Sequence, residues 1–186
     1  MLEYMEAIFN KFQGTVFKGT DKNVTHSYIP TYERLFESRR HDPIRLLEIG
    51  ICTGGSLMAW AEYFTSPETE IVGLDVTFEH ITFEFSSKIK TFLMDARVQS
   101  PDGVFDFIID DGSHYLNDQV MAFTRLKNHL KTGGVYIIED VYSMMDAQAL
   151  LTLGKMHGFK AELVDLTAVK GRWDDLMVIF SKESLH

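Results

Sequence analysis

Apolar residues at the start of the chain recur at helical spacing. The pattern over residues 2–12 predicts a short amphipathic helix, and residues 28–36 predict a second one. Gly14 and Gly19 bracket a loop between the two. The positions expected to face inward are Leu2, Met5, Ile8, Phe9 and Phe12 in the first helix and Tyr32, Leu35 and Phe36 in the second.

Seven later runs of apolar residues have the length of buried β-strands. Amphipathic segments over residues 56–64, about 115–132 and 143–157 separate several of them, with Ser56 expected to cap the first helix and Gly133-Gly134 to end the second. This alternation, ending in a hairpin, predicts an α/β fold: a doubly wound, mostly parallel seven-stranded sheet with an antiparallel last strand. The strands are expected at 44–49, 70–75, 90–95, 105–110, 135–139, 160–166 and 176–181.

Length and composition narrow the class of protein. The 186 residues fit a single domain, 1–186, in which residues 1–43 form an N-terminal helical cover. The formal charge, 18 − 27 = −9, comes without a basic stripe and disfavours a nucleic acid partner. One cysteine, no secretory signal pattern and no apolar stretch of membrane-spanning length indicate a cytoplasmic protein that does not enter the membrane.

A glycine-rich turn follows the first predicted core strand. It contains Glu48, Gly50, Thr53, Gly54 and Gly55, and glycines there let the backbone approach a ligand at a helix N-terminus. A dinucleotide fingerprint needs a glycine where Cys52 stands, so that match fails. The Glu-x-Gly-x-x-x-Gly-Gly pattern resembles the first motif of class I S-adenosylmethionine-dependent methyltransferases. The resemblance implies that Glu48, Gly50, Thr53, Gly54, Gly55 and Ser56 bind the cofactor's amino acid end.

Two further acids end the next two strands. Asp75 closes the second strand, where an acid can accept hydrogen bonds from both ribose hydroxyls, and Asp95 with Ala96 closes the third, where this fold usually contacts adenine. Strand-end acids are common in α/β proteins, but the glycine turn and both acids in register favour the cofactor. Cys52 has no adjacent histidine that would support thiolate chemistry and is interpreted as a small loop residue.

A second group of polar residues follows two apolar strands. Asp110, Asp111 and His114 follow one strand, and Glu139 and Asp140 follow the next, so they are expected to meet at the carboxyl edge of the sheet. Carboxylates packed that closely repel one another unless a cation or protons intervene. A magnesium site with a general base beside it is therefore predicted, and a solvated cluster of strand-end acids is the alternative.

These residues carry a more specific resemblance. Asp111-Gly112-Ser113-His114 with Gly133 to Asp140, and Gly19-Thr20-Asp21-Lys22 with His26 and Tyr28 earlier, resemble the metal-dependent macrocin and mycinamicin sugar O-methyltransferases and their cephalosporin hydroxylase-like relatives. The resemblance spans about Gly19 to Asp140. It implies that Asp111, Glu139 and Asp140 bind Mg²⁺ or Mn²⁺, that His114 is the catalytic base, and that S-adenosylmethionine donates a methyl group to a hydroxyl of a small molecule.

Several assignments stay open at this stage. Asp110 either orients its loop or faces the cofactor's sulfonium, and Tyr28 either reaches the cofactor or acceptor or packs internally. The turn 167–174, with Lys170, Arg172 and Trp173, is expected over the pocket. A catechol-type O-methyltransferase, an NAD-binding oxidoreductase and a non-catalytic binding protein are the alternatives, and a homo-oligomer is left open.

Overall fold

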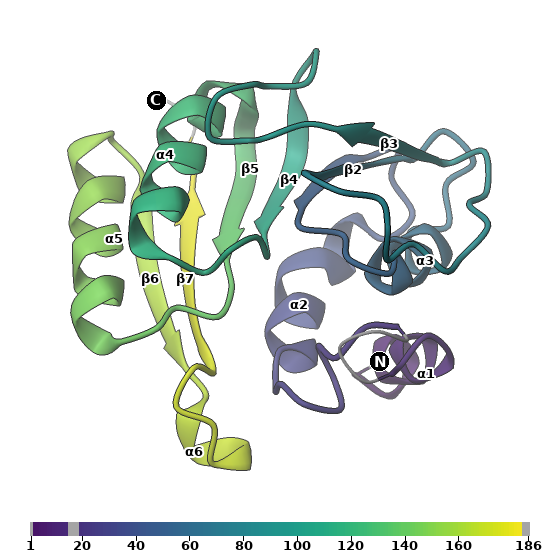
Figure 1. Ribbon diagram of the computed structural model, residues 1–186, viewed down its shortest axis with the longest axis horizontal. Coiled ribbons are helices and arrows are strands. Elements are labelled where there is room, and N and C mark those ends of the chain that lie inside the picture. Colours follow the sequence, from purple (N-terminus) through teal and green to yellow (C-terminus); the bar gives the residue numbers. More distant parts are fainter. Residues whose placement is uncertain (1, 15–18, 184–186) are drawn as a thin grey trace.

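The computed structural model describes residues 2–14 and 19–183, and its centre is one seven-stranded sheet. The strand order is β3-β2-β1-β4-β5-β7-β6, with β7 antiparallel to both of its neighbours (Figure 1). This confirms the predicted fold class. The strands are β1 (Arg45–Ile49), β2 (Glu70–Asp75), β3 (Ile89–Leu93), β4 (Phe105–Asp110), β5 (Leu130–Ile138), β6 (Lys160–Asp165) and β7 (Leu176–Ser181).

Helices cover both faces of the sheet. Because side chains alternate along a strand, each strand supplies apolar residues to two separate cores. One core packs against α1, α2 and α3 and the other against α4 and α5. The helices are α1 (Leu2–Lys11), α2 (Ile29–Phe36), α3 (Gly55–Tyr63), α4 (Leu116–Leu126), α5 (Met144–Met156) and the short α6 (Thr167–Lys170), with single turns η1 (Glu37–Arg39) and η2 (Lys127–His129).

The first helix packs as its spacing predicts. Met5, Ile8 and Phe9 of α1 are buried, whereas the side chain of Leu2 and the centre of the loop after Gly14 lie outside the described residues. In the part of the chain that the structure describes, no helix is long and apolar enough to cross a membrane.

Three local predictions are wrong. The N-cap of α3 is Gly54 in a left-handed conformation, not Ser56, because the turn from β1 is too tight for an extended cap. Helix α4 ends at Leu126, and Gly133-Gly134 lies inside β5, which begins five residues earlier than expected. The link between β6 and β7 contains α6 rather than a short turn, and it projects at the carboxyl edge as expected (Figure 1).

The register of the parallel strands places their ends together. Ile49 pairs with Leu74 on one side and with Asp110 on the other, and Asp110 pairs with Ile138. The residues that follow these positions therefore leave the sheet side by side at its carboxyl edge, where open α/β sheets bind ligands.

Candidate functional site

A cavity of about 430 Å³ lies at the carboxyl edge of β1, β2 and β4. This volume falls within the range of small-molecule sites. The predicted cofactor residues that line it are Gly50, Ser56, Asp75, Asp95, Ala96 and Asp110, and residues 19–21 of the N-terminal segment close one side. Glu48, Thr53, Gly54, Gly55 and Tyr28 were also predicted to bind the cofactor but are not among the lining residues.

The glycines of the turn let chain segments pass close to one another. A Cβ on Gly50, whose φ is +80°, would lie 2.0 Å from the carbonyl oxygen of Asp111. A Cβ on Gly55 would lie 2.6 Å from the backbone of Gly19 and Thr20. The glycine motif is therefore required for packing the N-terminal segment and the Asp111 loop around the cavity, and only Gly50 of these two also lines it.

Asp75 holds the glycine turn from the end of β2. Its Oδ2 accepts hydrogen bonds from the backbone N–H groups of Ile51 and Cys52 at 2.9 and 3.0 Å. Asp95 is paired with Arg97 at 2.8 Å, so its carboxylate is already partly satisfied. Burial raises the pKa of the Cys52 thiol, which agrees with its interpretation as a loop residue rather than a nucleophile.

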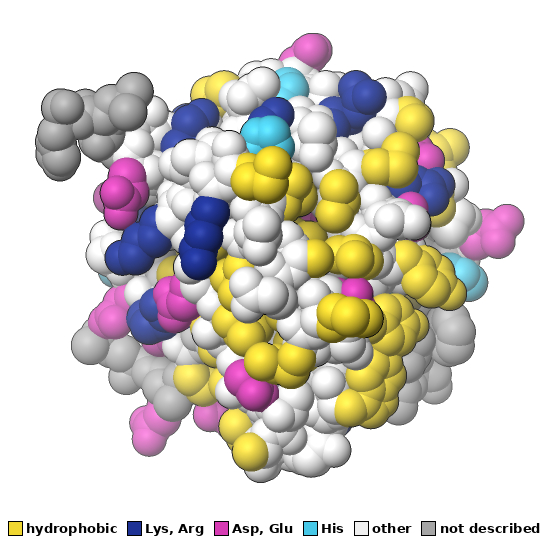
Figure 2. All heavy atoms as spheres, turned by 90° about the vertical axis from the view of Figure 1, so that its left-hand side faces the viewer, with side chains coloured by type: hydrophobic (Ala, Val, Ile, Leu, Met, Phe, Trp, Pro, Cys, Tyr) yellow, Lys and Arg dark blue, Asp and Glu magenta, His cyan; other side chains and the backbone are white. Residues whose placement is uncertain are grey.

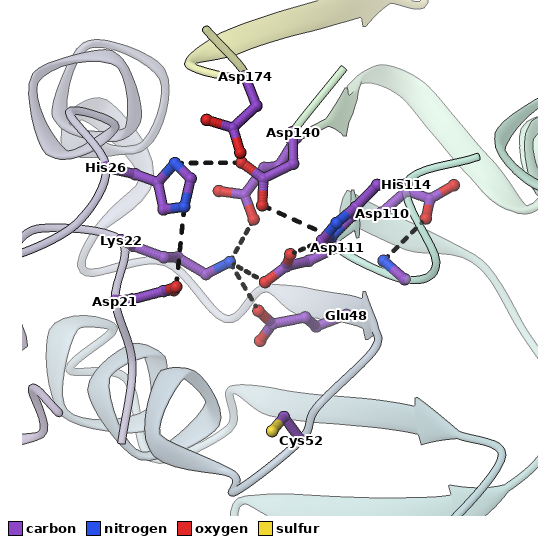
Figure 3. Close-up of polar contacts among 12 residues, drawn as sticks. Asp21, Lys22, His26, Glu48, Cys52, Asp110, Asp111, His114, Asp140 and Asp174 are labelled. Atoms are coloured by element: carbon purple, nitrogen blue, oxygen red, sulfur yellow. Dashed lines mark hydrogen bonds and ion pairs between the residues drawn. The ribbon is translucent and has the colours of Figure 1, made fainter. Parts of the chain in front are cut away.

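Three carboxylates, two of them fully buried, converge on one lysine. Glu48 lies in β1, Asp111 and Glu139 directly follow β4 and β5, and Lys22 points at them from the N-terminal segment (Figure 3). Its Nζ lies 3.3 Å from Glu48 Oε1 and 2.6 Å from Asp111 Oδ2, and it also contacts Glu139 Oε2. Tyr32 donates to the other oxygen of Glu139 at 2.6 Å.

A second cluster faces the cavity. His114 Nε2 lies 3.1 Å from Asp111 Oδ1 and 3.5 Å from Asp140 Oδ2. Asp111, His114 and Asp140 can each offer a ligand atom within 4.8 Å of the others, so they could hold a metal ion. The structure thus brings together two of the three predicted metal ligands with the predicted base. Glu139 is fully buried and held by Lys22 and Tyr32 instead.

Backbone strain is concentrated at this edge. Among the described residues, the non-glycine residues with positive φ are Cys52, His114 and Asp140, at +43°, +62° and +50°. All three line the cavity. Strained backbone of this kind persists where the surroundings enforce it and is typical of functional sites.

The N-terminal segment also holds Asp140. Tyr28 donates to Asp140 Oδ1, and His26 Nδ1 lies 3.1 Å from that oxygen and 2.6 Å from Asp175 Oδ1. Tyr28, 1% exposed, therefore packs against the acid cluster rather than reaching into the cavity. His26, Asp174 and Asp175 form a second group that could hold a metal ion.

The electrostatics of the two clusters differ. Burial would lower the pKa of Lys22, but Asp111, Glu139 and Glu48 outweigh it and raise that pKa well above its usual value. Burial also opposes ionisation of Asp111, yet Lys22 and His114 hold the pKa of this carboxyl below its usual range. Burial raises the pKa of Asp140 to about 6, with Asp111 adding to the rise.

His114 and Asp110 are shifted as well. Burial would lower the pKa of His114, but its hydrogen bond to Asp111 and the charges of Asp111 and Asp140 raise it to about 9. Burial raises the pKa of Asp110 to about 7. Asp110 accepts from Gly112 N at 3.3 Å and Tyr136 Oη at 3.4 Å, so it orients its loop while still lining the cavity.

The sheet topology and this edge resemble those of Rossmann-like methyltransferase domains. A family model described as "Methyltransferase domain" matches residues 47–138, which confirms the resemblance that the motifs indicated. The chain is 22% identical to MycE methyltransferase from the mycinamycin pathway, solved in complex with Mg, SAH and mycinamycin VI, with a TM-score of 0.71 over 96% of this chain and 53% of that one.

Curated relatives are more similar in sequence. The chain is 38% identical over 132 residues to an 8-demethyl-8-(2-methoxy-alpha-L-rhamnosyl)-tetracenomycin-C 3'-O-methyltransferase of Streptomyces olivaceus, which covers 63% of this chain and 33% of the relative. It is 34% identical over 132 residues to the mycinamicin VI 2''-O-methyltransferase of Micromonospora griseorubida. This match covers 63% of this chain and 32% of the relative. The chain therefore spans about a third of the length of these relatives.

Proposed function

We propose that this protein is a metal-dependent O-methyltransferase that moves a methyl group from S-adenosylmethionine to a hydroxyl of a small molecule, a sugar or another vicinal diol of a natural product. One observation carries the proposal. The glycine-turn cavity opens directly onto the cluster of Asp111, His114 and Asp140, which lines its wall. Relatives named as sugar O-methyltransferases support the choice of acceptor.

The residues present fit both S-adenosylmethionine and a divalent cation. The cavity is large enough for an adenosyl ligand, and its lining includes Asp75 at the end of β2 and Asp95 after β3. Asp111 and Asp140 provide the hard oxygen ligands that Mg²⁺ prefers. Glu139 adds a third carboxylate only if one of its oxygens faces the ion while Lys22 and Tyr32 hold the side chain.

The chemistry needs alignment and one proton acceptor. When bound, S-adenosylmethionine supplies a methyl group on a positively charged sulfur, and a divalent cation lowers the pKa of the acceptor hydroxyl. With both held there, His114 would take the proton of the acceptor hydroxyl as its oxygen displaces the methyl group from the sulfur. His114 is 31% exposed in its side chain and lies on the cavity wall, so an acceptor can reach it.

The state of His114 depends on its neighbours. The carboxylates that raise its pKa to about 9 are the same ones proposed to bind the cation. A cation compensates their charge, which lowers the pKa of the imidazole and frees it to accept a proton near neutral pH.

Exposed aromatic residues beside the cluster provide an acceptor surface. The rings of Tyr115 and Tyr142 stack at 5.9 Å, and those of Tyr142 and Trp173 at 5.1 Å. Hydrophobic side chains gather over the face in Figure 2. The exposed hydrophobic residues of α5 include Met144 and Met145. Trp173 is 59% exposed although one face of its ring stacks on Tyr142, and the exposed part can pack on a sugar ring or a flat apolar body.

The other predicted acceptor contacts are engaged elsewhere. Lys170 donates to the backbone carbonyls of His26 and neighbouring residues, and Arg172 is paired with Asp174 at 2.6 Å. Both residues therefore hold the loop, and Trp173 remains as the acceptor-facing candidate.

Two measurements test the proposal. Calorimetry should show that S-adenosylhomocysteine binds and NADH does not, which separates a methyltransferase from an NAD-binding protein. Transfer of labelled methyl from S-adenosylmethionine to a panel of glycosylated polyketides and catechols should require Mg²⁺ and stop with a chelator. Binding of NADH alone, or turnover that a chelator leaves unchanged, would contradict the proposal.

A further inference from the structure

Lys22 is buried where a free ammonium group is costly. Among the described residues it is the one lysine or arginine with a buried side chain, at 1% exposure. Moving a charge from water into a protein interior costs on the order of 20 kcal/mol before the protein relaxes, and still several kcal/mol after it has relaxed. The cost is offset here because three carboxylates from three adjacent strands surround the ammonium.

The ammonium shares Asp111 with the cavity-facing cluster. Lys22 binds Asp111 Oδ2 at 2.6 Å, while Asp111 Oδ1 lies 3.1 Å from His114 Nε2 (Figure 3). The two oxygens of one carboxylate are thus fixed from opposite sides. On its other side Lys22 contacts Glu139, whose remaining oxygen is held by Tyr32.

We propose that Lys22 is a positioning residue: its ammonium fixes the carboxylates of Asp111 and Glu139 so that Asp111 Oδ1 is presented to the divalent cation and to His114. This inference rests on the proposed metal-dependent function. It assigns Lys22 no contact with cofactor or acceptor, because the side chain lies behind the carboxylates.

The backbone that carries Lys22 is anchored at the cofactor turn. Thr53 Oγ1 donates to the carbonyl oxygen of Gly19 at 3.0 Å, and the backbone of Gly19 and Thr20 packs against Gly55. The position of the ammonium is therefore set by the same glycine turn that borders the cavity.

The affinity for Mn²⁺ distinguishes a positioning role of Lys22 from a purely electrostatic effect of its charge. A lysine that only adds positive charge near the ion repels it, so its removal would tighten binding. A positioning lysine supports the ligands, and loss of such support typically weakens metal binding 10–100-fold. We expect Lys22→Met to weaken Mn²⁺ affinity at least about tenfold, measured by electron paramagnetic resonance and calorimetry with S-adenosylhomocysteine present.

Lys170→Met is the matched control. Lys170 holds the same N-terminal segment through the backbone carbonyls of Asn23, Val24 and His26, but no ion pair joins it to a carboxylate among the described residues. Its Mn²⁺ affinity should stay within about threefold of the unsubstituted protein, a difference of under 1 kcal/mol. S-adenosylhomocysteine affinity without metal, which should change little in either variant, reports whether the domain remains folded.

A double variant covers the case in which Lys22→Met does not fold. Glu48→Gln removes one carboxylate that is not a proposed metal ligand, so Lys22→Met with Glu48→Gln is compared with Glu48→Gln alone. The same weakening of at least about tenfold is expected.

Three results would overturn the inference. They are unchanged or tighter Mn²⁺ binding without Lys22, an equal loss in Lys170→Met, and no Mn²⁺ binding by the unsubstituted protein. The last result would also remove the proposed metal-dependent function, whereas the first two would leave that function standing.

Discussion

The two charge clusters at the carboxyl edge share one carboxylate but are built for different tasks. Around Lys22, the side chains of Glu48 and Glu139 are fully buried, and one ammonium bridges them to Asp111. Around His114, the side chains of Asp111, Asp140 and the imidazole are 21, 11 and 31% exposed. The comparison teaches that the buried side fixes geometry and the open side is available for chemistry.

The largest effect should follow from removing the base on the open side. His114→Asn is expected to lower kcat by roughly 10²–10⁴-fold, the usual contribution of a positioned general base. S-adenosylhomocysteine affinity should stay unchanged because the imidazole is proposed to act on the acceptor. Steady-state kinetics and calorimetry provide the measurement, and a loss of under tenfold would show that another group takes the proton.

On the buried side, protein stability should respond as well as metal binding. Lys22→Met leaves the buried Glu48 and Glu139 without a counter-ion and is expected to lower the free energy of unfolding by about 3–5 kcal/mol. Glu48→Gln should cost less than about 1 kcal/mol, since Lys22 keeps Asp111 and Glu139. Urea denaturation of the metal-free protein measures both, and equal losses would contradict the role of Lys22 as the counter-ion.

Asp110 provides a pH test between the clusters. Its folded pKa of about 7 lies above the ordinary value of 3.8, so its contribution to stability is present below about pH 4 and is lost as pH rises through 7. Asp110→Asn removes the cost of ionising this buried carboxyl group. In the presence of a chelator, its melting temperature should exceed that of the unsubstituted protein by about 3 °C or more at pH 8, with little difference at about pH 3.5. A constant difference across this range would refute the shift.

The smallest effect concerns the acceptor surface. Trp173→Ala should raise the KM of the acceptor by up to about tenfold, which is about the 1.4 kcal/mol that one stacked aromatic contributes, with kcat little changed. Met156→Ala is the matched control, because Met156 is likewise exposed, at 78%, but lies on the last turn of α5. Equal KM values in both variants would place the acceptor elsewhere.

Much of the sheet could be predicted from the sequence because its signals are local. β2 and β4 begin and end where their apolar runs predict, and Ser143 caps α5 through Asp146 N at 3.1 Å. Gly133-Gly134 was misread because a glycine pair that normally ends a helix is here tolerated inside β5, where the register against β4 shifts. At this point the pairing of β5 with its neighbouring strands outweighs the low strand propensity of glycine.

The site was predictable only in part. Glu139 and Asp140 are neighbours just past the end of β5, but their side chains turn to different partners. Asp140 faces the cavity through a left-handed backbone conformation, and Glu139 faces Lys22. Lys22 itself was missed because its partners lie 89 and 117 residues away, and no local pattern links them.

Anomalous X-ray scattering from crystals containing Mn²⁺ and S-adenosylhomocysteine tests the central claim most directly. The account predicts one manganese peak per chain between Asp111 and Asp140, on the cavity side of Lys22, with the adenosyl group near Asp75. A peak only at His26, Asp174 and Asp175, or no peak beside an occupied cofactor cavity, would contradict it.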